Sequence, residues 1–233
     1  MDVSPALKDA VKDYFFLLNK AYPEKASVAL VGDRYRLSKD ERMVLFRGIT
    51  SYTQALARKN KLVSFPAGRE LHIDGYNVLF TLMNYRLGKL LFIGNDGYLR
   101  DAGGTHGRIG NQTLFLEIAG DFFCFLTEAG IQRVYVYLDS PVSHSALHTG
   151  HLRSLMERYA LEGGCELCES ADYALKRKNP PCIASADTAI IDALPGPFFD
   201  SARWYLQNRY GTVFLDLSLW ISPGADEHTQ FEK

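Results

Sequence analysis

The sequence contains little that would cross-link a protein or hold it in a membrane. Four cysteines in 233 residues are too few for the disulfide framework of a small secreted domain. The apolar runs are far shorter than the roughly 20 residues that a membrane-spanning helix needs. The first residues, MDVSPALKDAVKDYFF, mix acids and bases and lack the apolar core of a secretory signal. We therefore expect a cytoplasmic protein that does not bind membranes.

Net charge is also almost absent, formally −1, but the two signs are unevenly placed. Residues 1–65 hold 12 basic and 7 acidic side chains, a net charge of +5, which leaves −6 for residues 66–233. This asymmetry predicts two modules with different roles, although variation of the surface alone would also produce it. With 47% hydrophobic residues, the chain has enough apolar material for a sizeable core.

Helical patterns dominate the first module. Apolar residues of segment 6–20 recur at helical spacing, and Pro23 ends that pattern. Ser38 followed by Glu41 forms a capping-box motif, which predicts that a helix begins there and runs to about residue 48. Further helical segments are expected near residues 26–32 and 51–60. We predict a small, basic, all-helical domain over residues 1–65.

From residue 66 onward, short apolar runs alternate with amphipathic segments. This alternation is typical of an α/β domain with a mainly parallel sheet, here expected over residues 66–233. Strands are predicted at residues 70–74, 133–139, 165–169, 181–187 and 211–217. Helices are predicted at residues 76–87, 112–129, 146–160, 188–194 and 201–209. Residues 89–101 carry NDG between two apolar runs, which predicts a hairpin.

Several predicted strands end at an acid: Asp74, Asp139 and Asp187. Because the carboxyl ends of parallel strands lie at one edge of a sheet, these side chains should converge. Converging carboxylates repel one another unless a cation joins them, and Mg²⁺ prefers such oxygen ligands. The arrangement suits phosphodiester hydrolysis. An Asp after a strand can instead cap the next helix, which explains Asp187 well but leaves Asn77 beside Asp74 unexplained.

The acidic segments resemble those of known nucleases. HIDGYNVL is similar to the first motif of PIN-like nucleases of the NYN branch, YLDSPVSHS to the second acidic position and ASADTAIID to the third. The whole chain also resembles the prokaryotic family called domain of unknown function 434, with LVGDRYRLSKDERMVLFRG marking a helical domain before a PIN-like one. The resemblance implies a PIN-like, Rossmann-like sheet and a site for Mg²⁺ or Mn²⁺. Its implied catalytic and metal-binding residues are Asp74, Asp139 and Asp187, with Asp192 as a further ligand and Asn77 and Ser185 in support.

Other polar segments suggest secondary roles. Ser143 or Ser145 could cap a helix beginning near residue 146 and leave its N–H groups for a phosphate. In the glycine-rich loop 101–111, Arg108 could contact a phosphate, although an ordinary flexible loop explains the composition as well. The spacing of His144, His148 and His151 leaves a zinc site conceivable. The lone CxxC at residues 165–168 is better explained by buried structural cysteines.

Nucleic acid is the partner suggested by the basic module. Arg34, Arg36 and Arg42 could contact the phosphate backbone, with Tyr35 available to stack on a base. A solvated helix face with salt bridges to the acidic domain would explain the same residues.

These observations favour a metal-dependent nuclease that acts on RNA rather than DNA. A non-catalytic nucleic-acid-binding or protein-binding module remains an alternative, as does a phosphoesterase for a small substrate. A phosphatase of the haloacid dehalogenase type is excluded, because it needs a second Asp at position 76, where this sequence has Tyr76. The sequence leaves the oligomeric state open, a homo-oligomer included.

Overall fold

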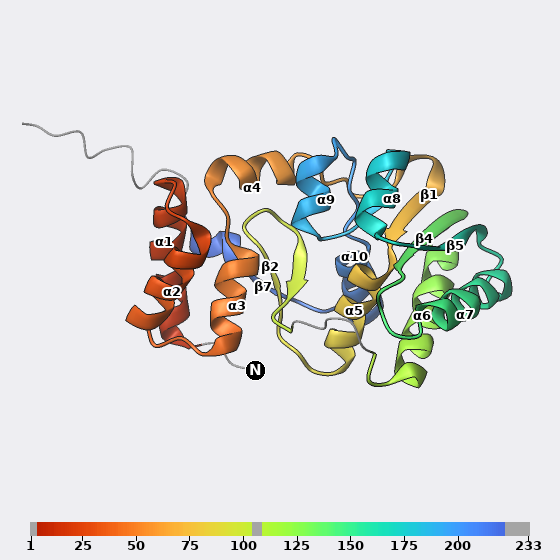
Figure 1. Ribbon diagram of the computed structural model, residues 1–233, viewed down its shortest axis with the longest axis horizontal. Helices are drawn as coiled ribbons and strands as arrows, with labels where there is room; N and C mark the ends of the chain where they lie inside the picture. The colour runs from red at the N-terminus through yellow and green to blue at the C-terminus, as the bar shows by residue number, and fades with distance from the viewer. Residues whose placement is uncertain (1–3, 104–108, 222–233) are drawn as a thin grey trace, which may run out of the picture.

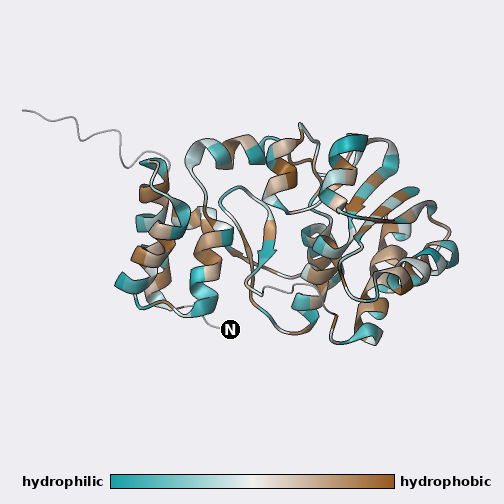
Figure 2. Cartoon of the chain, viewed as in Figure 1, coloured by the Kyte–Doolittle hydropathy of each residue, from teal (hydrophilic) through white to brown (hydrophobic). Residues whose placement is uncertain are grey.

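The computed structural model describes residues 4–103 and 109–221, in which a helical region precedes an α/β domain (Figure 1). The four helices expected in the first module are confirmed. They are α1 (Pro5–Asn19), α2 (Glu24–Arg34), α3 (Lys39–Gly48) and α4 (Tyr52–Lys59). Along the helices of both regions, hydrophobic and hydrophilic stretches alternate, as amphipathic helices require (Figure 2). Within the described residues, no helix combines the length and the apolar character needed to cross a membrane.

The predicted capping box at the start of α3 is present. Ser38 Oγ accepts a hydrogen bond from the Glu41 backbone N–H, and Glu41 Oε2 accepts one from the Ser38 N–H at 2.9 Å. Glu41 Oε1 also accepts from the Ser4 N–H at 2.9 Å, just before α1. Burial alone would raise the pKa of Glu41, but the hydrogen bonds from Ser4 and Ser38 outweigh it and lower that pKa to about 2. One carboxylate therefore holds the starts of two helices together.

Replacing this carboxylate should weaken the helical region. We expect Glu41→Ala to lower the free energy of unfolding by about 0.5–2 kcal/mol at pH 7, the usual cost of a lost cap. Since the folded pKa is lowered, this contribution should be fully present above about pH 4.5 and fade as the pH falls toward 2. Denaturant unfolding at pH 7 and pH 3 measures it, with Asp40→Ala as a neighbouring acid for comparison. Equal losses in the two variants would show that Glu41 has no special role.

The α/β domain is built on a four-stranded, entirely parallel sheet in the order β5-β4-β1-β6. Its strands are β1 (Glu70–Asp74), β4 (Arg133–Asp139), β5 (Glu162–Cys168) and β6 (Ile183–Ala184). The strands predicted at residues 70–74 and 133–139 are confirmed. The strand predicted at residues 181–187 is shorter, because β6 covers two residues only. β5 begins three residues before the strand predicted at residues 165–169 and includes Gly163. A Cβ at Gly163 would lie 2.0 Å from the Val134 carbonyl oxygen. Glycine is a poor strand signal, yet here close pairing requires it.

Helices cover both faces of this sheet, which gives the domain three layers. The larger core lies between β1 and β4 and one group of helices, and the smaller core lies on the opposite face. The first group comprises α5 (Gly75–Arg86), α6 (Gln112–Glu128), α7 (Ser145–Arg158) and α10 (Ser201–Tyr210). The second comprises α8 (Ala171–Lys178) and α9 (Thr188–Ala193). The predicted α/β class is therefore confirmed.

A second, smaller sheet has the order β3-β2-β7. The predicted hairpin supplies β2 (Leu91–Ile93) and β3 (Leu99–Asp101), which pair antiparallel. The strand expected at 211–217 was wrong in extent and place: β7 (Leu215–Asp216) has two residues and pairs with β2, away from the main sheet. Asp216 caps the short helix η2 (Leu217–Trp220) by accepting from the Ser218 N–H at 2.9 Å, and it lies in this smaller sheet rather than at the edge of the main sheet.

The small sheet is the surface on which the helical region packs. Phe92 of β2 and Leu217 of η2 are fully buried in the same apolar cluster as residues of α1 and α3. Contact is close at Gly48, where a Cβ would lie 2.5 Å from Leu217 and 2.7 Å from Phe92. The helical region and the end of the described chain thus share one core, which fixes α3 beside the hairpin.

Candidate functional site

The order of the main sheet brings the predicted acids together. Asp74 ends β1, Asp139 ends the neighbouring β4, and Asp187 follows β6 on the other side of β1. All three line one cavity of about 340 Å³ at this edge of the sheet. Residues separated by more than a hundred positions in sequence thus line one cavity.

Asp74 is held at the strand end by an abrupt turn into helix α5, which begins at the next residue, Gly75. A Cβ at this position would lie 2.6–2.9 Å from Leu138, Val136 and the Tyr137 carbonyl oxygen of β4. Glycine therefore allows α5 to start directly against the neighbouring strand. This local packing explains why the motif around Asp74 contains DG.

Asp74 is buried, and its electrostatic environment is unfavourable to a bare carboxylate. Burial raises the pKa of Asp74, the charges of Asp139 and Asp187 raise it further, and a hydrogen bond from Ser185 opposes them, leaving it at about 7. Ser185 Oγ donates that bond to Asp74 Oδ2 at 2.9 Å. Without a bound cation, the Asp74 carboxyl group is therefore part protonated and part ionised near pH 7.

The loop after β6 is tied to the start of α5 by the residues predicted to support the site. Ser185 Oγ accepts from the Asp187 N–H at 3.1 Å while it donates to Asp74. Asn77 Oδ1 accepts from the Ala186 N–H at 2.9 Å. Asp187 Oδ1 caps α9 by accepting from the Ala189 N–H at 2.7 Å, as the alternative interpretation of that residue predicted. Asp187 thus combines a capping role with a place in the cavity.

Asp139 also has a structural partner. Its Oδ1 accepts a hydrogen bond from the N–H of Ala171, the first residue of α8, at 2.8 Å. This bond fixes the end of β4 to a helix on the other face of the sheet. It uses one of the two carboxylate oxygens, so Asp139 Oδ2 has no hydrogen bond to the described part of the chain.

The predicted serine cap of α7 was wrong. The helix begins at Ser145, and its N-cap is His144, which has a left-handed φ of 64° and makes no side-chain cap bond. Ser145 Oγ is turned away and donates to the Ser140 carbonyl oxygen at 3.0 Å. Ser143 lies exposed in the preceding turn. A left-handed residue at the helix entry replaces the extended conformation that would place a hydroxyl over the first N–H groups.

The donor set of the cavity suits a hard, largely hydrated cation better than a tightly held one. Among residues 4–103 and 109–221, no three His, Cys, Asp or Glu side chains form a group that could hold a metal ion as they stand. Mg²⁺ needs only one or two carboxylates, because waters and substrate oxygens complete its octahedron. Asp74 and Asp139 end neighbouring strands and line the cavity, so they would be such a pair, and Asp187 lines it as well. Of the histidines considered for zinc, His148 is buried and bonds to the Tyr76 hydroxyl at 2.9 Å.

Asp192 does not line the acidic cavity. Both of its oxygens accept hydrogen bonds from Arg58 of α4, Oδ1 from Nε at 2.7 Å and Oδ2 from Nη2 at 2.6 Å. Arg58 also reaches Asp96 through Nη1 at 3.3 Å. Asp192 therefore joins α9 to the helical region, and its predicted contact with a metal gains no geometric support.

The arginines predicted to contact nucleic acid lie in the helical region, where two of them join its helices. Arg42 donates to Asp33 Oδ1 at 2.9 Å and to the Leu37 carbonyl at 3.1 Å, and Arg34 lies 3.6 Å from Asp13 Oδ2. Arg36 is exposed in the turn between α2 and α3. Their contact with nucleic acid stays a prediction, while Arg108 lies outside the described residues.

Sequence patterns did not single out Arg47 of α3 as part of the acidic site. Arg47 lines the same cavity as the three acids, and its Nη1 donates to the Asp101 carbonyl at 2.8 Å and to Asp101 Oδ1 at 3.4 Å. In the sequence it was one of several basic residues in the first module. Only the packing of α3 against the hairpin brings a cation from one region into the acidic edge of the other.

The comparisons with known proteins define a family without an established activity. Residues 65–202 match the family described as Domain of unknown function (DUF5616), and residues 6–61 match Protein of unknown function (DUF434). The first match spans more than half of the chain, so the chain belongs to the DUF5616 family. The resemblance of the helical region to the DUF434 family is confirmed.

The chain is also similar to a protein of known sequence from Methanocaldococcus jannaschii. The chain is 27% identical over 188 residues to Uncharacterized protein MJ0935 of Methanocaldococcus jannaschii, a region that covers 80% of this chain and 89% of that protein. No solved structure matches the chain.

Proposed function

We propose that this protein is a metal-dependent nuclease of the PIN-like, NYN type that cleaves single-stranded RNA. The observation that carries the proposal is the buried carboxyl group of Asp74, whose pKa is raised to about 7 beside Asp139 and Asp187. Perturbed acids that converge in a cavity are typical of functional sites, because a fold gains no stability from crowding like charges. The strand-end motifs of the sequence point to the same class.

The chain's own residues would position the reacting groups. Asp74 would hold the cation through its ionised carboxylate, whose orientation the hydrogen bond from Ser185 would fix. Asp139 keeps one oxygen on α8 and offers the other to the cavity. When bound, Mg²⁺ or Mn²⁺ supplies the positive charge against which a phosphodiester and an attacking water are held.

The size of the cavity supports a single-stranded substrate. A volume of about 340 Å³ lies at the lower end of the range of about 300–1,000 Å³ that is usual for small-molecule pockets. Such a space is large enough for one phosphodiester with its neighbouring sugar. RNA is proposed over DNA because of the resemblance to NYN nucleases.

Cleavage of a labelled single-stranded RNA tests the proposal. We expect the wild-type protein to cleave it with Mn²⁺ or Mg²⁺ and not with EDTA, and Asp139→Asn to reduce the rate at least about 100-fold, in the range of lost electrostatic catalytic groups. Asp121→Asn, the same substitution on an exposed face of α6, is the control and should keep the wild-type rate. Cleavage that persists in EDTA, or that survives Asp139→Asn, would argue against this site.

A non-catalytic binding module is the second candidate, and one observation favours it. Asp139 and Asp187 each cap or tether a helix, so their place at the sheet edge has a structural explanation. A protein of that kind would bind RNA without cleaving it and would not respond to Mn²⁺. Hydrolysis of p-nitrophenyl phosphate without RNA cleavage would instead indicate a phosphoesterase for a small substrate.

A further inference from the structure

A second cavity adjoins the acidic one and lies between the two regions of the protein. Its volume is about 370 Å³, and its lining comes from α2 and α3 on one side and from the hairpin and the start of α9 on the other. Arg47, Asn77 and Asp187 line both cavities, so the two spaces meet at these residues. A strand whose phosphodiester occupies the acidic cavity would therefore continue into this groove.

Arg47 is the cation at the junction. Within the described residues its hydrogen bonds use Nη1 alone, so Nε and Nη2 remain as donors. Two other arginines that line the groove already form ion pairs with carboxylates. Arg100 makes a two-pronged ion pair with Asp96, and Arg58 bonds to Asp192 and Asp96. The groove therefore offers one partly free guanidinium, which suits one phosphate rather than a long stretch of backbone.

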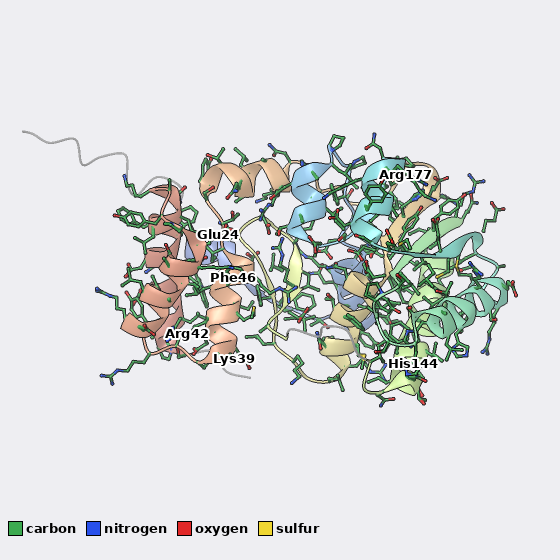
Figure 3. All side chains as sticks on the ribbon, in the orientation of Figure 1. Glu24, Lys39, Arg42, Phe46, His144 and Arg177 are labelled. Carbon is green, nitrogen blue, oxygen red and sulfur yellow. The ribbon has the colours of Figure 1, made fainter. Side chains whose placement is uncertain are left out.

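Phe46 precedes Arg47 in α3 and also lines the groove. Phe46 is 41% exposed although it is a large hydrophobic residue, and it lines the cavity together with Met43 and Glu24. Figure 3 shows Phe46 and Glu24 on adjacent helices of the helical region, with Arg42 toward the other end of α3. A phosphate beside Glu24 would be repelled, whereas an uncharged base can stack on Phe46.

We infer that this groove is a subsite for one nucleotide of single-stranded RNA next to the cleaved bond, with its phosphate on Arg47 and its base stacked on Phe46. The inference rests on the proposed nuclease function, because it places the nucleotide beside the acidic cavity. The helical region thereby takes part in substrate binding, since α3 supplies both contacts. The nucleic-acid contact then lies on the face of α3 toward the hairpin rather than at Arg34, Arg36 and Arg42.

Binding without cleavage tests the subsite separately from the chemistry. The affinity of a fluorescein-labelled adenosine octamer is measured by fluorescence anisotropy in EDTA. Phe46→Ala should weaken binding by about 10-fold, as the loss of one stacked base does. Phe46→Trp should keep it. Phe16→Ala is the matched control, since Phe16 of α1 is 43% exposed but does not line the groove, and it should leave affinity unchanged.

The phosphate contact has a distinct signature. Arg47→Gln should reduce the slope of log affinity against log salt by about 1, the effect of one lost phosphate contact. Arg36→Gln, an exposed arginine of the same region, should leave the slope unchanged. A melting curve for each variant verifies folding, because Arg47 also bonds to the buried Asp101.

The outcomes separate this inference from the proposed function. If the wild type cleaves RNA but Phe46→Ala binds like Phe16→Ala, the subsite is wrong and the nuclease stands. If Phe46→Ala weakens binding but the wild type never cleaves, the groove stands and the nuclease falls. Failure of the wild type to bind the octamer, or a reduced salt slope in Arg36→Gln but not in Arg47→Gln, would overturn the subsite.

Discussion

Metal-free Asp74→Asn protein is expected to be more stable than the wild type at pH 8 and about equally stable at pH 5. Folding raises the pKa of Asp74 from 3.8 to about 7, so the folded wild type holds a proton that the unfolded chain has released. That stabilisation is complete below pH 3.8 and is lost as the pH rises through 7. Between pH 5 and pH 8 the loss is roughly 3 kcal/mol, about two pKa units.

The substitution removes this pH dependence, because Asn cannot ionise and still accepts the bond from Ser185. The difference in unfolding free energy between variant and wild type should therefore grow by roughly 3 kcal/mol from pH 5 to pH 8. Guanidinium unfolding in EDTA at both pH values measures it.

Added Mn²⁺ should act in the opposite direction. An ion that binds only the folded wild type stabilises it by about 2.7 kcal/mol when the free ion is at 100 times its dissociation constant. In Asp74→Asn this stabilisation should shrink or vanish, since the charged ligand is gone. It should also weaken in the wild type at pH 5, because the ion and the proton compete for the same carboxylate.

Asp200→Asn is the matched control, since Asp200 is partly buried and burial likewise raises its pKa. It caps α10 by accepting from the Arg203 N–H at 3.0 Å, and it accepts from the Leu99 N–H at 2.7 Å. Its replacement keeps an oxygen that can cap α10 and should leave the Mn²⁺ response intact. If Mn²⁺ does not stabilise the wild type and Asp74→Asn is destabilising at both pH values, Asp74 is a structural acid and the nuclease proposal fails.

Arg100→Met is expected to destabilise the protein by about 3–5 kcal/mol, because it leaves a buried carboxylate short of its main partner. The Asp96 side chain is 1% exposed and receives bonds from Arg100 Nη1 at 2.7 Å and Nη2 at 2.8 Å. Burial would raise the pKa of Asp96, but Arg100 and Arg58 outweigh it and lower that pKa. Arg58 alone, at 3.3 Å, cannot replace a two-pronged contact.

Two further variants decide whether the buried charge is the cause. Adding Asp96→Asn to Arg100→Met should recover part of the lost stability, because the unpaired charge is gone. Arg209→Met, which breaks the exposed pair with Glu128 at 3.5 Å, should cost no more than about 1 kcal/mol. Equal losses for Arg100→Met and Arg209→Met would show that the Asp96 pair contributes little.

Arg100 also shows where sequence patterns were incomplete. In the sequence it stood at the edge of a glycine-rich loop, where an arginine is as well explained by a mobile surface segment. In the structure it is 3% exposed and joins the hairpin to the loop after β6 through the Ala186 carbonyl at 3.2 Å. Asp96 belongs to the NDG turn, whose composition explains a hairpin without any charged partner. The pairing of these two residues depends on side-chain directions that no local pattern encodes.

Residue order was enough to predict the α-helices other than α8, the strands of residues 70–74 and 133–139, and the convergence of Asp74, Asp139 and Asp187. Periodicity, capping motifs and the common edge of parallel strands are local or topological rules, so they can be applied without coordinates. Three-dimensional packing was needed to show that β7 leaves the main sheet and that Asp192 bonds to Arg58. It also placed Arg47 of the helical region in the acidic cavity. These contacts depend on how α3 and α4 pack against the α/β domain, which is set by the fit of Gly48, Phe92 and Leu217 in a core that residue spacing does not reveal.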